Sequence, residues 1–92
     1  MSEAKHTPGP WQWTQHFDPT ISIYKDGFGQ IARLYDSSAG TGKANARLIA
    51  AAPDLLDALY LVRDYIATMK GNGHEYSMSI DAAIAKATGG AA

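Results

Sequence analysis

Three short segments near the start of the chain alternate apolar and polar residues, which is the period of a half-buried β-strand. The segments cover residues 11–15, 20–24 and 30–35. They are separated by turn residues, such as the Asp26-Gly27 pair before the third segment. We therefore predict an antiparallel β-meander over residues 9–35, in which Ala32 and Leu34 face the core.

The strongest periodic signal in the sequence is helical. Apolar residues recur at alternating spacings of four and three, the seam of a helix that packs lengthwise against a partner. The seam positions are Leu48, Ala52, Leu55, Leu59, Val62, Ile66 and Met69. Pro53 interrupts this pattern, because a proline inside a helix removes a backbone hydrogen bond at a cost of about 3 kcal/mol. We predict a long helix over residues 43–70 that kinks or restarts near Ala52.

A shorter helix is predicted at the end of the chain. Residues 71–73 contain two glycines and an asparagine, which suit the end of the long helix. Residues 74–76 are interpreted as a link, and Ser79 suits a helix N-cap. The predicted C-terminal helix covers residues 79–88, which completes an α+β fold of order β-β-β-α-α.

Length makes an oligomer the expected state. The chain has 92 residues, and we predict a single domain over 1–92 with a flexible start over 1–8. A domain of this size buries only about 60% of the surface of its unfolded chain. A second apolar stripe on the long helix, formed by Ala58, Leu61 and Tyr65, exceeds what the sheet and the short helix can cover. We predict that this stripe contacts a second copy of the chain in a dimer or higher oligomer.

Charge and cysteine content exclude several classes of function. Eight Lys and Arg against nine Asp and Glu give a net charge of −1, which argues against general nucleic-acid binding and against attraction to anionic membranes. The chain has no cysteine, so it has no disulfide framework and no thiolate zinc site. Its start lacks an apolar leader, and no run approaches the roughly 18 apolar residues that span a bilayer. We predict a cytoplasmic protein without a cofactor.

The loop before the long helix resembles a phosphate-binding loop in its position. The segment 37–44 lies between a predicted strand and a predicted helix, but Ser37 replaces the leading glycine and Ala44 replaces the hydroxyl that would hold magnesium. Nucleotide hydrolysis is therefore not expected. Two interpretations stay open: a solvated loop, or a helix start that holds an anion together with Lys43 and Arg47.

Other candidate groups give weaker signals. Arg33, Lys43 and Arg47 form a small basic cluster if the third strand lies beside the helix start. Trp11 and Trp13 suit a small core better than a ligand site, because aromatic side chains dominate core burial. The three histidines have no metal-ligand spacing, and no arrangement of nucleophile and base is recognisable. We therefore predict a protein that is not an enzyme.

Two stretches carry a family resemblance. HTPGPW at 6–11 and ANARLIAAAPDLLDAL at 44–59 resemble paired signatures of small bacteriophage and prophage proteins, and residues 83–89 are similar to their ending. The layout also resembles the Thoeris anti-defence sponges, which bind cyclic nucleotide immune signals between subunits without cleaving them. The resemblance implies a phage-encoded, non-enzymatic anti-defence protein in the host bacterial cytoplasm that sequesters a nucleotide.

On this resemblance the ligand contacts are divided among six residues. Arg33, Lys43 and Arg47 would contact phosphates, Asn45 would hydrogen-bond ribose or base, and Trp13 or Tyr35 would stack on the base. One alternative is a protein-binding inhibitor of a host defence enzyme, similar to an anti-CRISPR, in which the stripe of Ala58, Leu61 and Tyr65 faces a host protein. Another alternative is a phage accessory or assembly protein.

Overall fold

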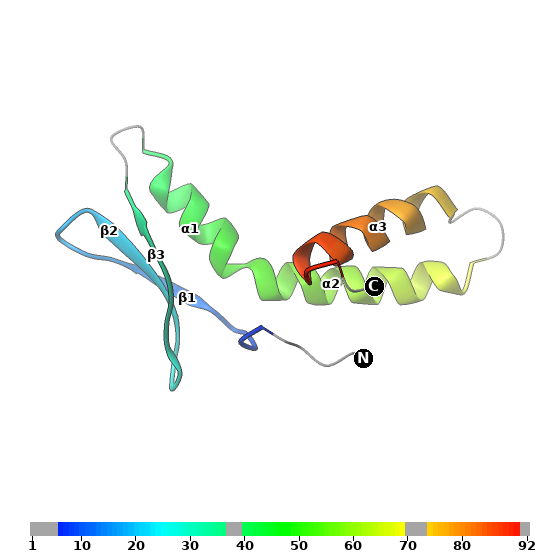
Figure 1. The fold of residues 1–92 in the computed structure, drawn as a ribbon, viewed down its shortest axis with the longest axis horizontal. Helices are drawn as coiled ribbons and strands as arrows, with labels where there is room; N and C mark the ends of the chain where they lie inside the picture. The colour runs from blue at the N-terminus through cyan, green and yellow to red at the C-terminus, as the bar shows by residue number, and fades with distance from the viewer. Residues whose placement is uncertain (1–5, 37–39, 70–73, 91–92) are drawn as a thin grey trace. The chain divides into compact units, whose positions relative to one another are not determined.

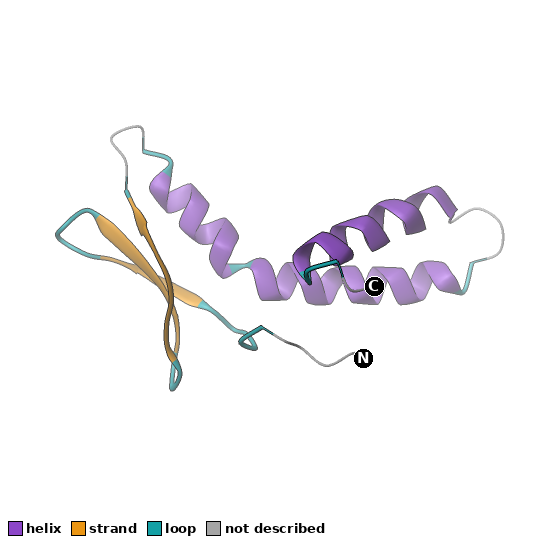
Figure 2. Ribbon diagram, in the orientation of Figure 1, coloured by secondary structure: helices purple, strands orange, loops and turns teal. Residues whose placement is uncertain are grey.

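The computed structural model describes residues 6–36, 40–69 and 74–90. The elements in chain order are β1 (Gln12–Gln15), β2 (Thr20–Lys25), β3 (Gly29–Tyr35), α1 (Gly42–Ala50), α2 (Ala52–Ala67) and α3 (His74–Ala87), as Figures 1 and 2 show. The predicted α+β class and the order of strands before helices are confirmed, with the long helical segment divided in two.

The chain forms two compact units. The sheet unit, Ala4–Asp54, contains the three strands, α1 and the first turn of α2. The helical unit, Leu55–Ala92, contains the rest of α2 together with α3. The predicted single domain stays a prediction, and each unit is described by itself below.

The sheet unit encloses its core between β2 and α1. The sheet is antiparallel in the order β1-β2-β3, and every strand boundary lies within one residue of the prediction. Ile21 and Ile23 of the central strand are fully buried, and α1 covers them with the equally buried Ala46. We call this side of the sheet the inner face. Ala32 and Leu34 pack against the same cluster, which confirms the predicted core face of β3.

A β-bulge in β3 corrects one detail of the predicted pattern. Ile23 pairs with Ala32, but the next residue, Tyr24, pairs with Gln30, so Ile31 is an extra residue in β3. Strict alternation places Ile31 on the opposite face with Arg33. The structure instead packs Ile31 against the core cluster, because a bulge inserts a residue and bends the strand locally.

Pro53 accounts for the division of the long helix. The helix predicted over 43–70 is two helices: α1 ends at Ala50 and α2 begins at Ala52, while position 70 lies outside the described residues. In a continuous helix the carbonyl of Ile49 accepts a hydrogen bond from the amide of residue 53. Pro53 has no N–H, so this bond is missing. In the first turn of α2 this missing N–H costs nothing, because amides there have no helical partner. Asp54, also in that turn, complements the positive end of the helix dipole.

The predicted seam is largely exposed, which is a second correction. Leu48, Leu55, Val62 and Met69 all belong to the exposed large hydrophobic residues, whereas Leu56, one position from the seam, is buried. Several apolar stripes run along these helices, and a spacing of three and four fits more than one of them. The stripe predicted to remain uncovered within the chain is exposed: Leu61 is 68% and Tyr65 is 69% exposed, and Ala58 is exposed too.

The last helix starts earlier than predicted. It begins at His74, so residues 74–76 are helical and do not form the predicted link, and the boundaries 79–88 are wrong at the N-terminal end. Ser79 is favoured at N-caps because its hydroxyl bonds to free amides, yet here it lies inside the helix. Met78 and Ala82 around it are good helix formers, which outweighs the modest cost of an interior serine. Ile84 of this helix is buried.

The stretch before β1 is tied to the sheet and to the start of α2. Lys25 Nζ donates hydrogen bonds to the carbonyl oxygens of Pro8 and Gly9, each at 2.9 Å, and Trp11 Nε1 donates to the carbonyl of Thr7 at 2.9 Å. A Cβ atom placed on Gly9 would lie 3.0 Å from Cβ of Pro53, so the glycine allows a close approach. A flexible start was predicted over residues 1–8. Thr7 and Pro8 in this segment accept the hydrogen bonds described above, and residues 1–5 lie outside the described residues.

Candidate functional site

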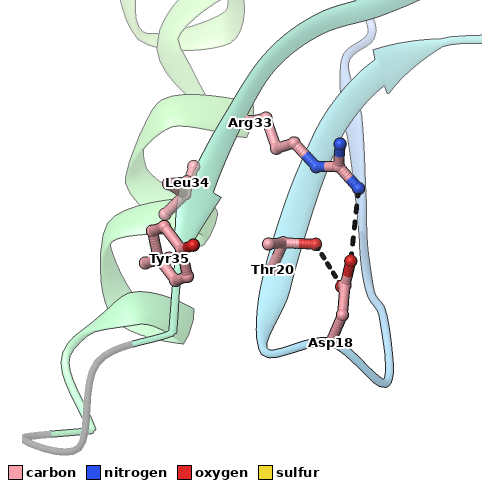
Figure 3. A pocket seen from close by; sticks show the side chains of 5 residues that line it. All are labelled: Asp18, Thr20, Arg33, Leu34 and Tyr35. Atoms are coloured by element: carbon pink, nitrogen blue, oxygen red, sulfur yellow. Dashed lines mark hydrogen bonds and ion pairs between the residues drawn. The ribbon is translucent and has the colours of Figure 1, made fainter.

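A hollow of about 420 Å³ lies at the end of β3. It is lined by Asp18, Thr20, Arg33, Leu34 and Tyr35 (Figure 3), and we call it the strand-end hollow. Two of the six predicted ligand residues, Arg33 and Tyr35, line it together. The other three lining residues were not predicted as part of a site.

Strand pairing brings these residues together from two elements and a turn. Thr20 opens β2 directly opposite Tyr35 of β3. Asp18, in the turn before β2, accepts a hydrogen bond from Thr20 Oγ1 at 2.6 Å and forms an ion pair with Arg33, in which Nη2 lies 3.6 Å from Oδ2. Both charged side chains remain more than half exposed, so the pair is open to solvent and to competing ligands.

The hydroxyl of Thr20 holds the pKa of Asp18 below its ordinary value, because the hydrogen bond stabilises the carboxylate. The positive charge of Arg33 acts in the same direction. The carboxylate is therefore ionised at neutral pH. As a result the hollow presents one positive and one negative group side by side.

The hollow combines groups that suit a flat ligand with an anionic arm. An arginine fork matches a phosphate group, and a carboxylate accepts hydrogen bonds from the amino group of a base. Tyr35 is 76% exposed, and an exposed aromatic ring is a stacking platform. Figure 3 shows Arg33 and Thr20 directed toward Asp18, while the Tyr35 ring lies apart from them beside Leu34. The aromatic and the charged groups thus lie at different parts of the hollow.

The other predicted ligand residues lie elsewhere in the sheet unit. Trp13 pairs with Ile23 and packs against the core on the inner face, and the guanidinium of Arg47 lies 5.8 Å from the centroid of its ring. This cation–π contact engages both residues within the protein. Lys43 and Asn45 are exposed on α1, and neither lines the hollow. The structure therefore does not gather all six residues at one site.

The loop compared above with a phosphate-binding loop lies partly outside the described residues, at positions 37–39. Thr41 is the N-cap residue of α1, but its side chain makes no capping hydrogen bond. Gly42 packs closely against the end of β3: a Cβ atom there would lie 2.6 Å from Cα of Asp36 and 3.0 Å from the carbonyl oxygen of Tyr35. This glycine lets α1 start directly beside the strand.

A hydrogen-bond chain that sequence spacing did not reveal crosses the outer face of the sheet, opposite the inner face. His16 Nε2 lies 2.8 Å from Oγ of the buried Ser22, and Ser22 Oγ donates to Gln30 Oε1 at 2.8 Å. Because the hydroxyl hydrogen points to Gln30, His16 donates to the serine and does not accept its proton. Proton transfer to a base requires the opposite direction. In the sequence, the only sign of this hydrogen-bond chain is the polar Ser22 between the apolar Ile21 and Ile23.

Neither a metal centre nor a membrane span is found in the described part of the chain. Among those residues no group of three or more His, Cys, Asp or Glu side chains is placed to hold a metal ion. None of the helices there is both long enough and apolar enough to cross a bilayer.

Comparison with known protein families relates this chain to a phage family. A family described as Salmonella phage P22 protein Y8K6 matches this chain over residues 1–91, which includes both units and the strand-end hollow. No curated protein and no solved structure matches the chain.

Proposed function

The chain belongs to the family of Salmonella phage P22 protein Y8K6, and on this premise we propose that it is an anti-defence protein that sequesters a nucleotide signal. Membership in this family identifies the chain as a small phage protein. One observation supports the finer proposal: Arg33 and Tyr35, named from the sequence as ligand residues, line one hollow.

In this proposal three of the five lining residues each have a separate task. Arg33 binds a phosphate, and Asp18, released from its ion pair with Arg33, accepts hydrogen bonds from the amino group of the base. Tyr35 stacks on the base. The favoured ligands are nucleotides whose base carries an exocyclic amino group, because a base that offers only acceptors would face the Asp18 carboxylate unfavourably.

The proposed action is binding without cleavage. A nucleotide held in the hollow meets a guanidinium, a carboxylate, a hydroxyl that already donates to Asp18, and an aromatic ring. None of these groups is an activated nucleophile paired with a base. The bound nucleotide is therefore expected to be recovered intact.

Native mass spectrometry with a panel of cyclic nucleotides and cyclic ADP-ribose isomers tests this proposal. We expect one or more members of the panel to bind intact. Arg33→Gln and Tyr35→Ala should each weaken binding about 5- to 100-fold, the range expected for a lost charged hydrogen bond or base stack. Lys43→Gln removes an exposed positive charge outside the hollow and should leave binding unchanged. Failure of the whole panel to bind, or equal effects of the Arg33 and Lys43 variants, would overturn the proposal.

The anti-defence role needs a separate measurement in cells. A phage that lacks this protein should form fewer plaques on a host whose defence uses the bound nucleotide. Expression of the chain should restore plaque formation, whereas expression of the Arg33→Gln variant should not. Restoration by both versions would show that a different surface counters the host.

A second candidate function is inhibition of a host defence enzyme by direct protein binding. The exposed Leu61 and Tyr65 of α2 favour it, because monomeric proteins seldom leave large apolar side chains uncovered in a row. This candidate and the first one depend on different surfaces. Loss of activity on substitution in α2 with nucleotide binding intact would favour the protein-binding inhibitor.

A further inference from the structure

One side of α2 carries a continuous apolar stripe that the chain leaves exposed. Its members are Leu55, Ala58, Val62 and Tyr65, continued by Met69 just beyond Ala67, the last residue of the helix, and every one of them is exposed. Their spacings alternate between three and four residues, which keeps them on one side of a helix and matches the seam of a two-stranded coiled coil. We call this set the α2 stripe.

We propose that the α2 stripe binds a second copy of this chain, with the two α2 helices antiparallel and crossing near Val62. No position of the stripe is charged, so both copies can bury it without desolvating an ion. A two-fold axis brings the same surface from each copy together, and this requires a stripe that is complementary to itself. Alternating spacings of three and four residues provide that complementarity, because knobs from each helix fill holes in the other.

The exposed area is sufficient for a small stable interface. The α2 stripe and the neighbouring Leu61 expose on the order of 600 Å² in each copy, given typical side-chain areas. Pairing would then remove about 1,200 Å² from water, which is the lower limit of stable protein interfaces. Tyr65, the most exposed of the large side chains in the stripe, supplies an aromatic anchor close to the centre.

The helix dipoles favour the antiparallel orientation, because opposed dipoles place the positive end of each α2 beside the negative end of the other. Asp57 and Asp64 lie on the side of α2 turned away from the stripe. These carboxylates therefore stay in water when the stripe pairs.

The absence of cysteine from the chain allows a direct test by disulfide trapping. Val62→Cys should crosslink two copies under mild oxidation, because an antiparallel crossing brings that position close to its counterpart. Leu55→Cys should crosslink to a differently tagged Met69→Cys chain and only weakly to itself. Ala67→Cys lies on the opposite side of the helix and should not crosslink.

Solution mass provides the second measurement. Native mass spectrometry and light scattering should give twice the 9.8 kDa mass of the chain. Val62→Asp should raise the dissociation constant of the dimer at least tenfold, while Ala67→Asp should not change it. Since Val62 is partly exposed, circular dichroism should confirm that the variant remains helical.

Three results would overturn the proposal. A chain that stays monomeric at about 100 μM, well above typical micromolar dissociation constants, does not pair through the stripe. Self-crosslinking of both Leu55→Cys and Met69→Cys, without the mixed product, would establish a parallel pair. A monomeric chain that binds a purified host protein, and loses that binding in Val62→Asp, would assign the stripe to a host partner. These measurements do not involve nucleotides, so their failure is distinct from failure of the proposed function.

Discussion

The sheet unit and the helical unit bury apolar residues to different extents. In the sheet unit Ile21, Ile23 and Ala46 are fully enclosed. In the helical unit Leu56 and Ile84 are buried, yet many large apolar side chains of α2 and α3 remain exposed. Three paired strands and a helix can surround a side chain on every side, whereas a helix that packs along one line leaves its other faces open. The sheet unit therefore has a complete core, whereas the helical unit leaves much of its apolar surface exposed.

The largest expected effect comes from the enclosed core. Ile23→Ala should lower the free energy of unfolding by about 2–5 kcal/mol, because it leaves a cavity that the paired strands cannot close. Urea unfolding followed by tryptophan fluorescence measures this in the sheet unit, since Trp11 and Trp13 both lie there. Met78→Ala removes an exposed side chain from the helical unit and should cost less than about 0.5 kcal/mol. Equal costs for the two variants would contradict the difference between the units.

A smaller effect is expected where α1 meets β3. Gly42→Ala places a Cβ atom 2.6 Å from Cα of Asp36, and backbone atoms cannot move aside as a flexible side chain can. We expect a loss of about 1–3 kcal/mol in the free energy of unfolding, typical of overpacking. Lys43→Ala, at the next and exposed position, is the matched control and should be nearly neutral. A neutral Gly42→Ala would show that α1 can shift away from β3.

The smallest effect is expected from the exposed ion pair. Folding lowers the pKa of Asp18, so its carboxylate stabilises the folded chain at pH values above its ordinary pKa of 3.8. This stabilisation is lost as the pH falls further and the carboxylate is protonated in the folded chain. Asp18→Asn removes the contribution at every pH. The difference in unfolding midpoint between the natural chain and the variant should therefore be small at pH 7 and vanish near pH 2. A difference that grows on acidification would show that another group titrates there.

The sheet could be predicted well from the sequence, because alternation in β2 defines which side chains share a face. The alternation over residues 20–24 places Ile21 and Ile23 on one face, and the structure buries both. Their partner residues Ala32 and Leu34 were correctly assigned to the core. The bulge at Ile31 could not be predicted, since alternation carries no signal for one inserted residue.

The helical segments show the limit of periodicity. An irregularity near Ala52, either a kink or a restart, was predicted because proline lacks an amide hydrogen, and the structure shows a restart. The face that is buried could not be predicted: the spacing selected Leu55, while the structure buries Leu56. Adjacent stripes on one helix are equally periodic, and tertiary packing chooses between them.

The candidate site could be predicted only in part. Arg33 and Tyr35 were named from their residue types and from the resemblance, and the structure places both in the strand-end hollow. Asp18 and Thr20 were missed because a turn and a strand pairing bring them to the hollow, and neither is visible as a spacing. Trp13 and Arg47 were included because basic and aromatic residues suit a nucleotide, but they contact each other on the inner face.

The close approach of Gly9 to Pro53 has a consequence for how this family can vary. The two family-like segments identified from the sequence, 6–11 and 44–59, touch at these residues. A larger residue at position 9 would place its Cβ atom 3.0 Å from Cβ of Pro53, so the proline would have to shift or be replaced. Replacing the proline would remove the reason for α2 to begin where it does. Relatives are therefore expected to inherit the glycine and the proline together, so that a sequence with only one of them marks a change in how its helices begin.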